Sequence, residues 1–150
     1  MNASPPLTLT VQRASRTTGQ PSRQSLLRWS RAALAGPAQV TIRLVDRREG
    51  QALNRTFRER DYPTNVLTFV YGREADTWVG DLVLCAPVVK AEARAQKKPL
   101  AHHYAHLVVH GLLHLQGYDH EKPRAARVME ALETRILAEL SIPDPYQALH

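Results

Sequence analysis

The sequence predicts an α+β fold in which a small mixed sheet of about four strands is covered by about five helices. Two observations lead to this expectation. Short segments that alternate apolar and polar residues, or that are rich in β-branched and aromatic residues, are typical of strands. Longer segments with apolar residues three and four apart are typical of helices that pack on one face. At 150 residues the chain is expected to form one domain, over residues 1–150.

Four segments are expected to form the strands. Residues 7–11 and 39–45 alternate apolar and polar side chains, as half-buried strands do. Residues 66–71 and 78–85 are rich in valine, leucine and aromatic residues, and a turn around Gly72 separates them.

Five segments are expected to form the helices, and most of them begin or end at a proline, a glycine or a capping residue. The last helix has apolar residues at helical spacing between Val128 and Leu140, which favours core packing, and residues 143–146 read as an irregular tail. The expected helices begin after Ser22, at Asp46, at Pro87, at Pro99 and at Pro123.

The composition is that of a soluble globular protein, with 43% hydrophobic and 23% charged residues. No apolar run approaches the ~20 residues of a membrane helix. The first residues lack the basic start and apolar core of a signal peptide. Cys85 is the only cysteine, so no intramolecular disulfide can form, and it is expected to pack in the core. These features predict a cytoplasmic protein.

Positive charge is concentrated in the first part of the chain. Residues 1–60 contain 11 arginines and three acidic residues, whereas residues 61–150 contain nine basic and 11 acidic residues. The planar guanidinium group suits phosphate. The bias favours a polyanionic partner, RNA or DNA first, and the alternative is a solvated basic face.

The most informative segment runs from His110 to His120 and has histidines at its first, fifth and last positions. Residues four apart share one face of a helix, so His110 and His114 can direct two imidazoles at one ion. Gly117 supplies the left-handed residue that ends a helix, and the chain can then return so that His120 reaches the same point. Three nitrogen ligands with an open fourth position are typical of a catalytic zinc site.

This spacing is also the ligand frame of the metzincin proteases, whose zinc-site helix the segment resembles. Those proteases carry a glutamate directly after the first histidine, which takes a proton from the metal-bound water. Gly111 stands at that position here and cannot take a proton, which makes peptide hydrolysis the less favoured chemistry.

The other histidines are interpreted as structural. His102, His103 and His106 are expected to satisfy buried groups on an amphipathic helix, and His150 at the terminus carries no signal. Asp119 and Glu121 flank His120, and orientation of imidazole N–H groups is the role expected for them. Two other residues have open roles. Asp81 either shapes the floor of the cleft or caps a strand-to-helix turn, and Tyr118 is a packed ring or a proton donor.

A second polar segment, residues 53–65, carries three arginines ahead of the strand at residues 66–71. Pro63 restrains its neighbour to extended geometry, so this rigid loop can hold a cation near a site. On composition alone, a basic surface loop is the favoured interpretation.

Three blocks of the sequence, in this order, resemble the YbeY family of bacterial rRNA maturation factors. They are Leu53 to Phe69, with the string F-R-E-R-D-Y-P-T-N-V-L-T-F inside it, Gly80-Asp81-Leu82-Val83, and His110 to His120. The resemblance spans residues 39–146 or so, and the first 35 residues add little to it.

The resemblance implies a single-strand-specific, metal-dependent endoribonuclease that acts in 16S rRNA 3′-end maturation and ribosome quality control. The family's three zinc ligands correspond to His110, His114 and His120, which implies one Zn²⁺ ion. Its functionally important arginine corresponds to Arg58, which is expected to bind the scissile phosphate. The partners implied are rRNA, the small ribosomal subunit, ribosomal proteins and a ribosome-assembly GTPase.

Two rival functions remain open at this stage. One is a metal hydrolase of another class, a peptidase or amidase, suggested by the metzincin-like spacing. The other is a ribosome-assembly factor whose zinc is structural and whose RNA cleavage is weak or absent. No residue stands out in the sequence as the general base.

Overall fold

The computed structural model describes residues 5–58 and 64–146, and it confirms the α+β class and the four-stranded mixed sheet. The elements follow one another along the chain as β1 (Leu7–Ala14), α1 (Arg23–Ala33), β2 (Ala38–Val45), α2 (Arg47–Arg58), β3 (Val66–Glu74), β4 (Thr77–Cys85), α3 (Ala86–Ala95), α4 (Leu100–Leu115) and α5 (Pro123–Glu139).

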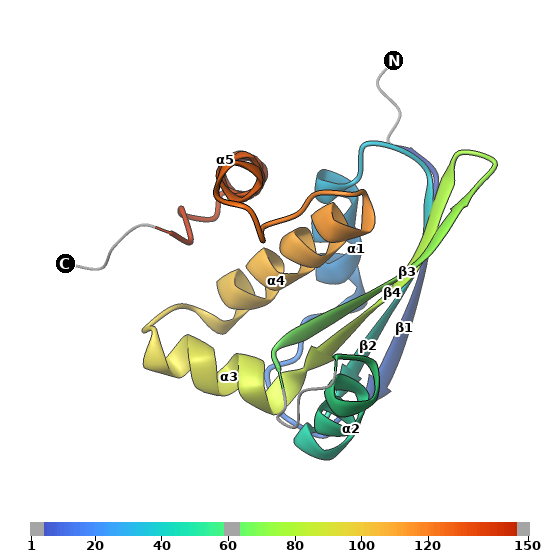
Figure 1. The fold of residues 1–150 in the computed structure, drawn as a ribbon. Coiled ribbons are helices and arrows are strands. Elements are labelled where there is room, and N and C mark those ends of the chain that lie inside the picture. The colour runs from blue at the N-terminus through green and yellow to red at the C-terminus, as the bar shows by residue number, and fades with distance from the viewer. Residues whose placement is uncertain (1–4, 59–63, 147–150) are drawn as a thin grey trace.

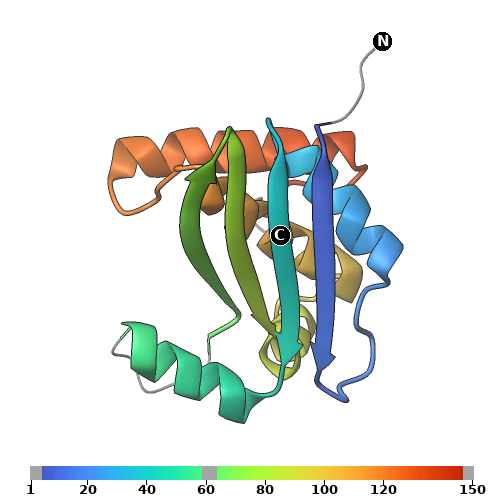
Figure 2. The ribbon, with the colours of Figure 1, turned by 90° about the vertical axis from the view of Figure 1, so that its right-hand side faces the viewer.

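The strand order across the sheet is β1-β2-β4-β3. β1 and β2 are parallel, β2 and β4 are parallel, and β3 pairs antiparallel with β4 through the short turn after Glu74. β3 is an edge strand, so one side of its backbone pairs with no other strand of this sheet. Figures 1 and 2 show the strongly twisted sheet with most helices against one of its faces.

The main core lies between that face and α4. Alternate residues of β2 point into it, as the period-two pattern predicted, and Ile42 pairs with Leu82 of β4 in the middle of the sheet. α4 is buried along most of its length, with Tyr104 and Leu112 fully enclosed between the sheet and the other helices. α4 packs against α1, α3, α5, β3 and β4, which makes it the central element of the fold (Figure 1).

A smaller cluster lies on the opposite face, where α2 covers the ends of β2 and β4. It contains Val45, Leu67, Val83 and Cys85, with Leu53 of α2 packed against them. Cys85 is therefore a buried core residue, as expected.

The starts expected for α1, α3 and α5 agree with the structure. Ser22 is the N-cap of α1 and accepts a hydrogen bond from the backbone N–H of Ser25 at 3.1 Å. Pro87 and Pro123 lie in the first turns of α3 and α5, where a missing N–H costs nothing. None of the described helices has both the length and the apolar character needed to cross a bilayer.

Several arginines of the basic N-terminal part tie elements together. Arg23 donates to the Leu9 carbonyl at 2.9 Å, and Arg28 donates to the Leu140 carbonyl at 3.3 Å. Arg43 forms a two-pronged ion pair with Glu49, with its shorter N–O distance at 2.6 Å. The arginine bias therefore has a structural component beside any role in binding a polyanion.

Candidate metal centre

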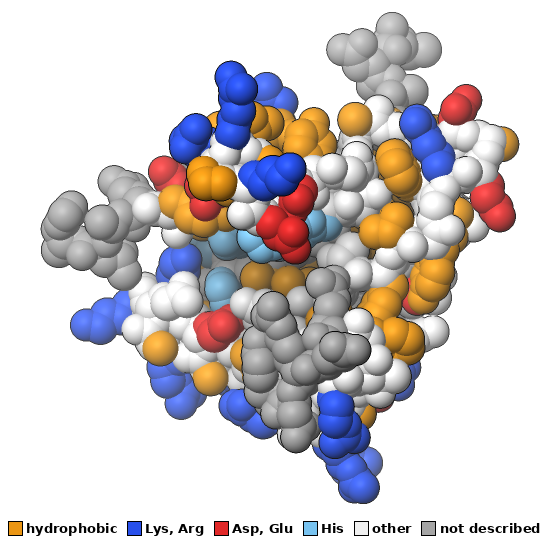
Figure 3. All heavy atoms as spheres, in the orientation of Figure 1, with side chains coloured by type: hydrophobic (Ala, Val, Ile, Leu, Met, Phe, Trp, Pro, Cys, Tyr) orange, Lys and Arg blue, Asp and Glu red, His pale blue; other side chains and the backbone are white. Residues whose placement is uncertain are grey.

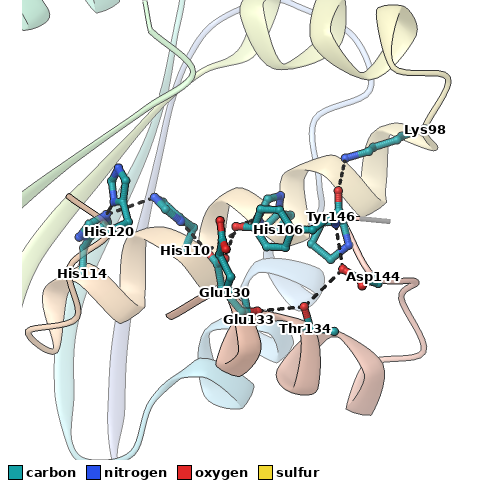
Figure 4. A network of polar contacts seen from close by, with 11 residues as sticks. Lys98, His106, His110, His114, His120, Glu130, Glu133, Thr134, Asp144 and Tyr146 are labelled. Atoms are coloured by element: carbon teal, nitrogen blue, oxygen red, sulfur yellow. Dashed lines mark hydrogen bonds and ion pairs between the residues drawn. The ribbon is translucent and has the colours of Figure 1, made fainter. Parts of the chain in front are cut away.

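The structure brings together the three histidines that the sequence singled out. His110 and His114 lie one turn apart on α4, and His120 lies in the loop between α4 and α5 (Figure 4). His114 Nε2 is 3.2 Å from His110 Nε2 and 2.8 Å from His120 Nδ1. One nitrogen from each ring fits within a group whose atoms all lie within 4.8 Å of one another.

The turn that returns the chain toward His120 depends on Gly117. Its φ is +98°, a left-handed conformation that residues with a Cβ adopt only at a cost. The Gly117 N–H donates to the His114 carbonyl at 2.9 Å, and the Tyr118 N–H donates to the Leu113 carbonyl at 3.1 Å. These two bonds form the Schellman motif, which satisfies the last carbonyls of α4 and reverses the chain.

The Schellman turn also fixes the tautomer of His114. It places the Tyr118 carbonyl 2.9 Å from His114 Nδ1. A carbonyl can only accept, so Nδ1 carries the proton and Nε2 presents its lone pair toward the other two histidines. Burial, with the neighbouring charges of His110 and His120, lowers the pKa of His114 to about 4, so the ring is neutral at pH 7.

His110 is held in the same tautomer by a carboxylate. Its Nδ1 donates to Glu133, a fully buried residue of α5. Burial by itself raises the pKa of Glu133, but hydrogen bonds from His106, His110 and Tyr146 outweigh it and bring that pKa down to about 2. Because the carboxylate is ionised and can only accept, His110 Nδ1 carries the proton of this hydrogen bond, and Nε2 is the ring nitrogen that faces His114.

The resulting arrangement fits a metal ion. Nε2 of His110 and Nε2 of His114 lie 3.2 Å apart and face the same point as Nδ1 of His120, which is 2.8 Å from His114 Nε2. Two nitrogens bound tetrahedrally to zinc at about 2.0–2.1 Å lie about 3.3 Å apart. Neutral imidazoles are ligands for zinc and for several other transition metals, so the donor set suits a metal without naming it.

The histidines line a cavity of about 570 Å³ beside the edge strand β3. In Figure 3, histidine side chains lie at the floor of a hollow with acidic side chains at its rim. The cavity is lined by Asn54 of α2, by residues 64–68 and Val70, by His110, His114 and His120, and by Asp119 and Glu121.

A match to a family model and to curated relatives decides the family. The model described as endoribonuclease YbeY matches residues 13–141. An endoribonuclease YbeY of Aromatoleum aromaticum is 56% identical over 96% of this chain and 95% of its own. That of Thiobacillus denitrificans is 54% identical over 96% of this chain and 99% of its own.

The chain belongs to the YbeY endoribonuclease family. The resemblance found in the three sequence blocks is thereby confirmed. The solution structure of a Thermotoga maritima protein is also similar, with a TM-score of 0.54 and 25% identity over 93% of this chain and all of that one.

Gly111 occupies the place where a metzincin has its glutamate, and packing explains the residue here. A Cβ at this position would lie 2.8 Å from Leu82 Cδ2 and 3.2 Å from Thr68 Oγ1. Leu82 is fully buried, so α4 approaches the sheet closely only because position 111 has no side chain. A YbeY chain with this packing has no room for the protease's proton acceptor.

Arg58, the arginine expected at the phosphate, is the last residue of α2, and its side chain lies outside the described part of the chain, as do residues 59–63. It follows Asn54, a buried residue that lines the cavity, by one helical turn.

Some expected roles of neighbouring residues were wrong. Asp119 was expected to orient an imidazole, but its Oδ1 accepts the backbone N–H of Glu121 at 3.0 Å. The N–H groups of the two α4 histidines go to Glu133 and to a backbone carbonyl instead. The local sequence around His120 suggested that a flanking carboxylate orients an imidazole. The carboxylate that does so is Glu133, which comes from α5, a helix that folds back onto α4.

Asp81 has neither of the roles considered for it. It lies in the middle of β4, and its carboxylate accepts the Tyr71 hydroxyl at 2.7 Å. Tyr118 is 38% exposed, and it is the residue's backbone carbonyl that contacts the site.

The remaining histidines of α4 lie outside the cluster of three. His103 pairs with Glu92 at 2.9 Å, which is the structural role expected of it. His106 contacts the hydroxyl of Tyr146 at 3.2 Å and lies 3.7 Å from Glu133.

Glu133 and Tyr146 were missed by the sequence interpretation. A signal for Glu133 was present, because it falls on the apolar stripe of α5 four residues after Met129 and four before Leu137, both fully buried. A charged residue at a core position of a helix needs a partner. Tyr146 had no comparable signal, since it stands in a tail without periodicity.

Proposed function

We propose that the protein is a single-strand-specific, metal-dependent endoribonuclease that acts in 16S rRNA 3′-end maturation and in ribosome quality control. The relatives that it matches over nearly their full length are named endoribonucleases. The observation that supports this best is the convergence of one ring nitrogen from each of His110, His114 and His120, all within 4.8 Å of one another, on the wall of a cavity.

The proposed ligands are His110, His114 and His120, holding one Zn²⁺ ion. Three protein nitrogens leave a coordination position open toward the cavity, as in catalytic rather than structural zinc sites. When bound, the ion would polarise a phosphoryl oxygen or lower the pKa of a water molecule. The protein's own contribution is to hold two rings in the tautomer that offers Nε2, through Glu133 and the Tyr118 carbonyl.

Arg58 is proposed to bind the scissile phosphate and to stabilise the negative charge that develops there. A guanidinium group forms two parallel hydrogen bonds with phosphate oxygens and keeps its charge at any physiological pH. The orientation of α2 supports this role, because Asn54, one turn earlier, lines the cavity.

The proposed partners are rRNA and the small ribosomal subunit, with ribosomal proteins and a ribosome-assembly GTPase as further partners, in the cytoplasm. Contacts with the RNA backbone release counterions, so the affinity for RNA is expected to fall steeply as the salt concentration rises.

The test is incubation of the purified protein with 16S rRNA precursor, beside a His114→Ala variant purified identically and with metal content read on both samples. Cleavage by the wild type alone supports the proposal and excludes a contaminating nuclease. Equal cleavage by both proteins would refute it.

The same experiment separates the two rival functions. No cleavage in either sample, together with co-sedimentation with small ribosomal subunits, would favour an assembly factor with structural zinc. A peptidase would instead cleave peptides. The packing around Gly111 argues against this function, because it leaves no space for the glutamate that such proteases use.

A further inference from the structure

Among residues 5–58 and 64–146, Glu133 is the only acidic residue that is fully buried. Its relative exposure is 0%, in the middle of α5. Burying an ionised carboxylate is costly unless every oxygen finds a donor. The donors around Glu133 therefore indicate which groups its carboxylate binds and holds in place.

Both carboxylate oxygens of Glu133 have partners. Oε1 accepts from Nδ1 of His110 and lies 3.7 Å from Nε2 of His106. Oε2 accepts from the hydroxyl of Tyr146. In Figure 4, Glu133 stands between His110 on one side and Tyr146 on the other, so it connects the cluster of three histidines with the C-terminal segment.

The C-terminal segment, residues 143–146, is itself held in place by side chains of two helices. Asp144 Oδ1 accepts the Tyr146 N–H at 2.8 Å and lies 3.3 Å from the Thr134 hydroxyl of α5. Lys98, which precedes α4, donates to the Pro145 carbonyl at 3.3 Å. The Tyr146 ring also packs edge-on against His106, with ring centres 5.3 Å apart.

We propose that Glu133 is a positioning residue for the metal site and that Tyr146 acts through it, so that the C-terminal segment sets how tightly the histidines bind their ion. The proposal rests on the metal centre assigned above. Glu133 fixes the ring plane and the tautomer of His110 and makes its Nε2 a stronger ligand. Tyr146 fixes the carboxylate in turn by occupying the other oxygen.

Glu133 belongs to a second group, with His106 and His110, whose ligand atoms also lie within 4.8 Å of one another. We assign this group to support of the first site rather than to a second ion. His110 Nδ1 carries the proton that it donates to Glu133, and a protonated nitrogen cannot bind a metal at the same time. One ion per chain is therefore expected.

The alternative is that Glu133 and Tyr146 merely fasten α5 and the C-terminal segment to α4. Substitutions would then lower the stability of the metal-free protein and leave its metal affinity unchanged. Metal affinity and the spectrum of bound Co²⁺ separate the two roles, since both report on the ligands rather than on the fold.

The test compares Glu133→Gln, Tyr146→Phe, the double variant and a control, Glu139→Gln, which changes an exposed carboxylate of the same helix. Zinc dissociation constants are measured by chelator competition, and Co²⁺ absorption spectra are recorded. The melting temperature of each metal-free variant shows whether it folds. Tyr146→Phe keeps the ring and loses only the hydroxyl, so it tests the proposal even if Glu133→Gln does not fold.

The proposal predicts that Glu133→Gln weakens zinc binding by about 10–100-fold and alters the Co²⁺ spectrum. Tyr146→Phe should weaken it less, Glu139→Gln should not change it, and the double variant should match Glu133→Gln because the tyrosine acts through the carboxylate.

Dissociation constants within twofold of wild type for both single variants, with unchanged Co²⁺ spectra, would overturn the proposal while leaving the metal site itself intact. A wild-type protein that bound no zinc would overturn the metal site and this proposal together.

Discussion

Replacing Gly117 by alanine tests whether the turn after α4 builds the metal site. A Cβ at this position would meet no atom within 4 Å, so the whole effect comes from the backbone, whose φ is +98°. A left-handed conformation costs a residue with a Cβ about 1–2 kcal/mol. For a chain of this length 1 kcal/mol shifts the melting temperature by about 2–4 °C, so the expected loss is about 2–8 °C.

The same substitution is expected to weaken zinc binding. If the turn relaxes, the Tyr118 carbonyl leaves its position 2.9 Å from His114 Nδ1, and loss of such a supporting bond costs on the order of tenfold in metal affinity. Calorimetric melting of the metal-free protein and chelator competition measure the two effects separately.

Gly36→Ala is the matched control, because a Cβ there also meets no atom within 4 Å and its φ is not in the left-handed region. Gly117→Asn should lie between alanine and wild type, since asparagine tolerates left-handed geometry. If Gly117→Ala melted and bound zinc like wild type, the proposed link between turn and site would be wrong.

Four further predictions follow from packing and from the site. Gly111→Ala should lower the free energy of unfolding by about 1–3 kcal/mol in urea titrations, because the buried Leu82 side chain cannot move away; an unchanged midpoint would show that α4 has room. Chelation should lower the melting temperature of the zinc-loaded wild type but not that of His114→Ala, because free zinc at 100 times its dissociation constant adds about 2.7 kcal/mol to the free energy of unfolding; equal shifts would argue against this ligand. Arg58→Glu should keep its zinc and lose RNA cleavage, and full cleavage by this variant would remove the role proposed for the residue. Cys85 is 1% exposed, and burial raises the pKa of its thiol, so a disulfide reagent should modify it only upon unfolding; rapid reaction of the native protein would contradict its core position.

The elements of the fold were predictable because local pattern and tertiary role agree along most of the chain. The prolines at 87 and 123 lie in the first turns of helices, and the alternation of β2 is realised as one fully buried face and one that is only partly covered. Strand order was not predictable in this way. The residues of β3 do not show which strands lie beside it, and the structure places it at the edge of the sheet, next to β4.

Part of the metal centre was likewise predictable from the sequence, and part was not. His110, His114 and His120 are close in sequence, and a helix followed by a left-handed glycine brings them together, so spacing alone predicted the cluster. Glu133 and Tyr146 reach it from 23 and 36 residues beyond His110, through the return of α5 and the C-terminal segment onto α4. Sequence spacing carries no information about that return. The flanking Asp119 was the nearer candidate and the wrong one.

In the function proposed above, one zinc ion on three histidines supports cleavage of RNA. The most direct test is titration of metal-free protein with Zn²⁺ while the initial rate of cleavage of 16S rRNA precursor is measured. The rate should rise linearly and stop rising at one equivalent of zinc, and His114→Ala should gain no activity over the same range. Full cleavage by the metal-free protein, or a rate that His114→Ala matches, would contradict it.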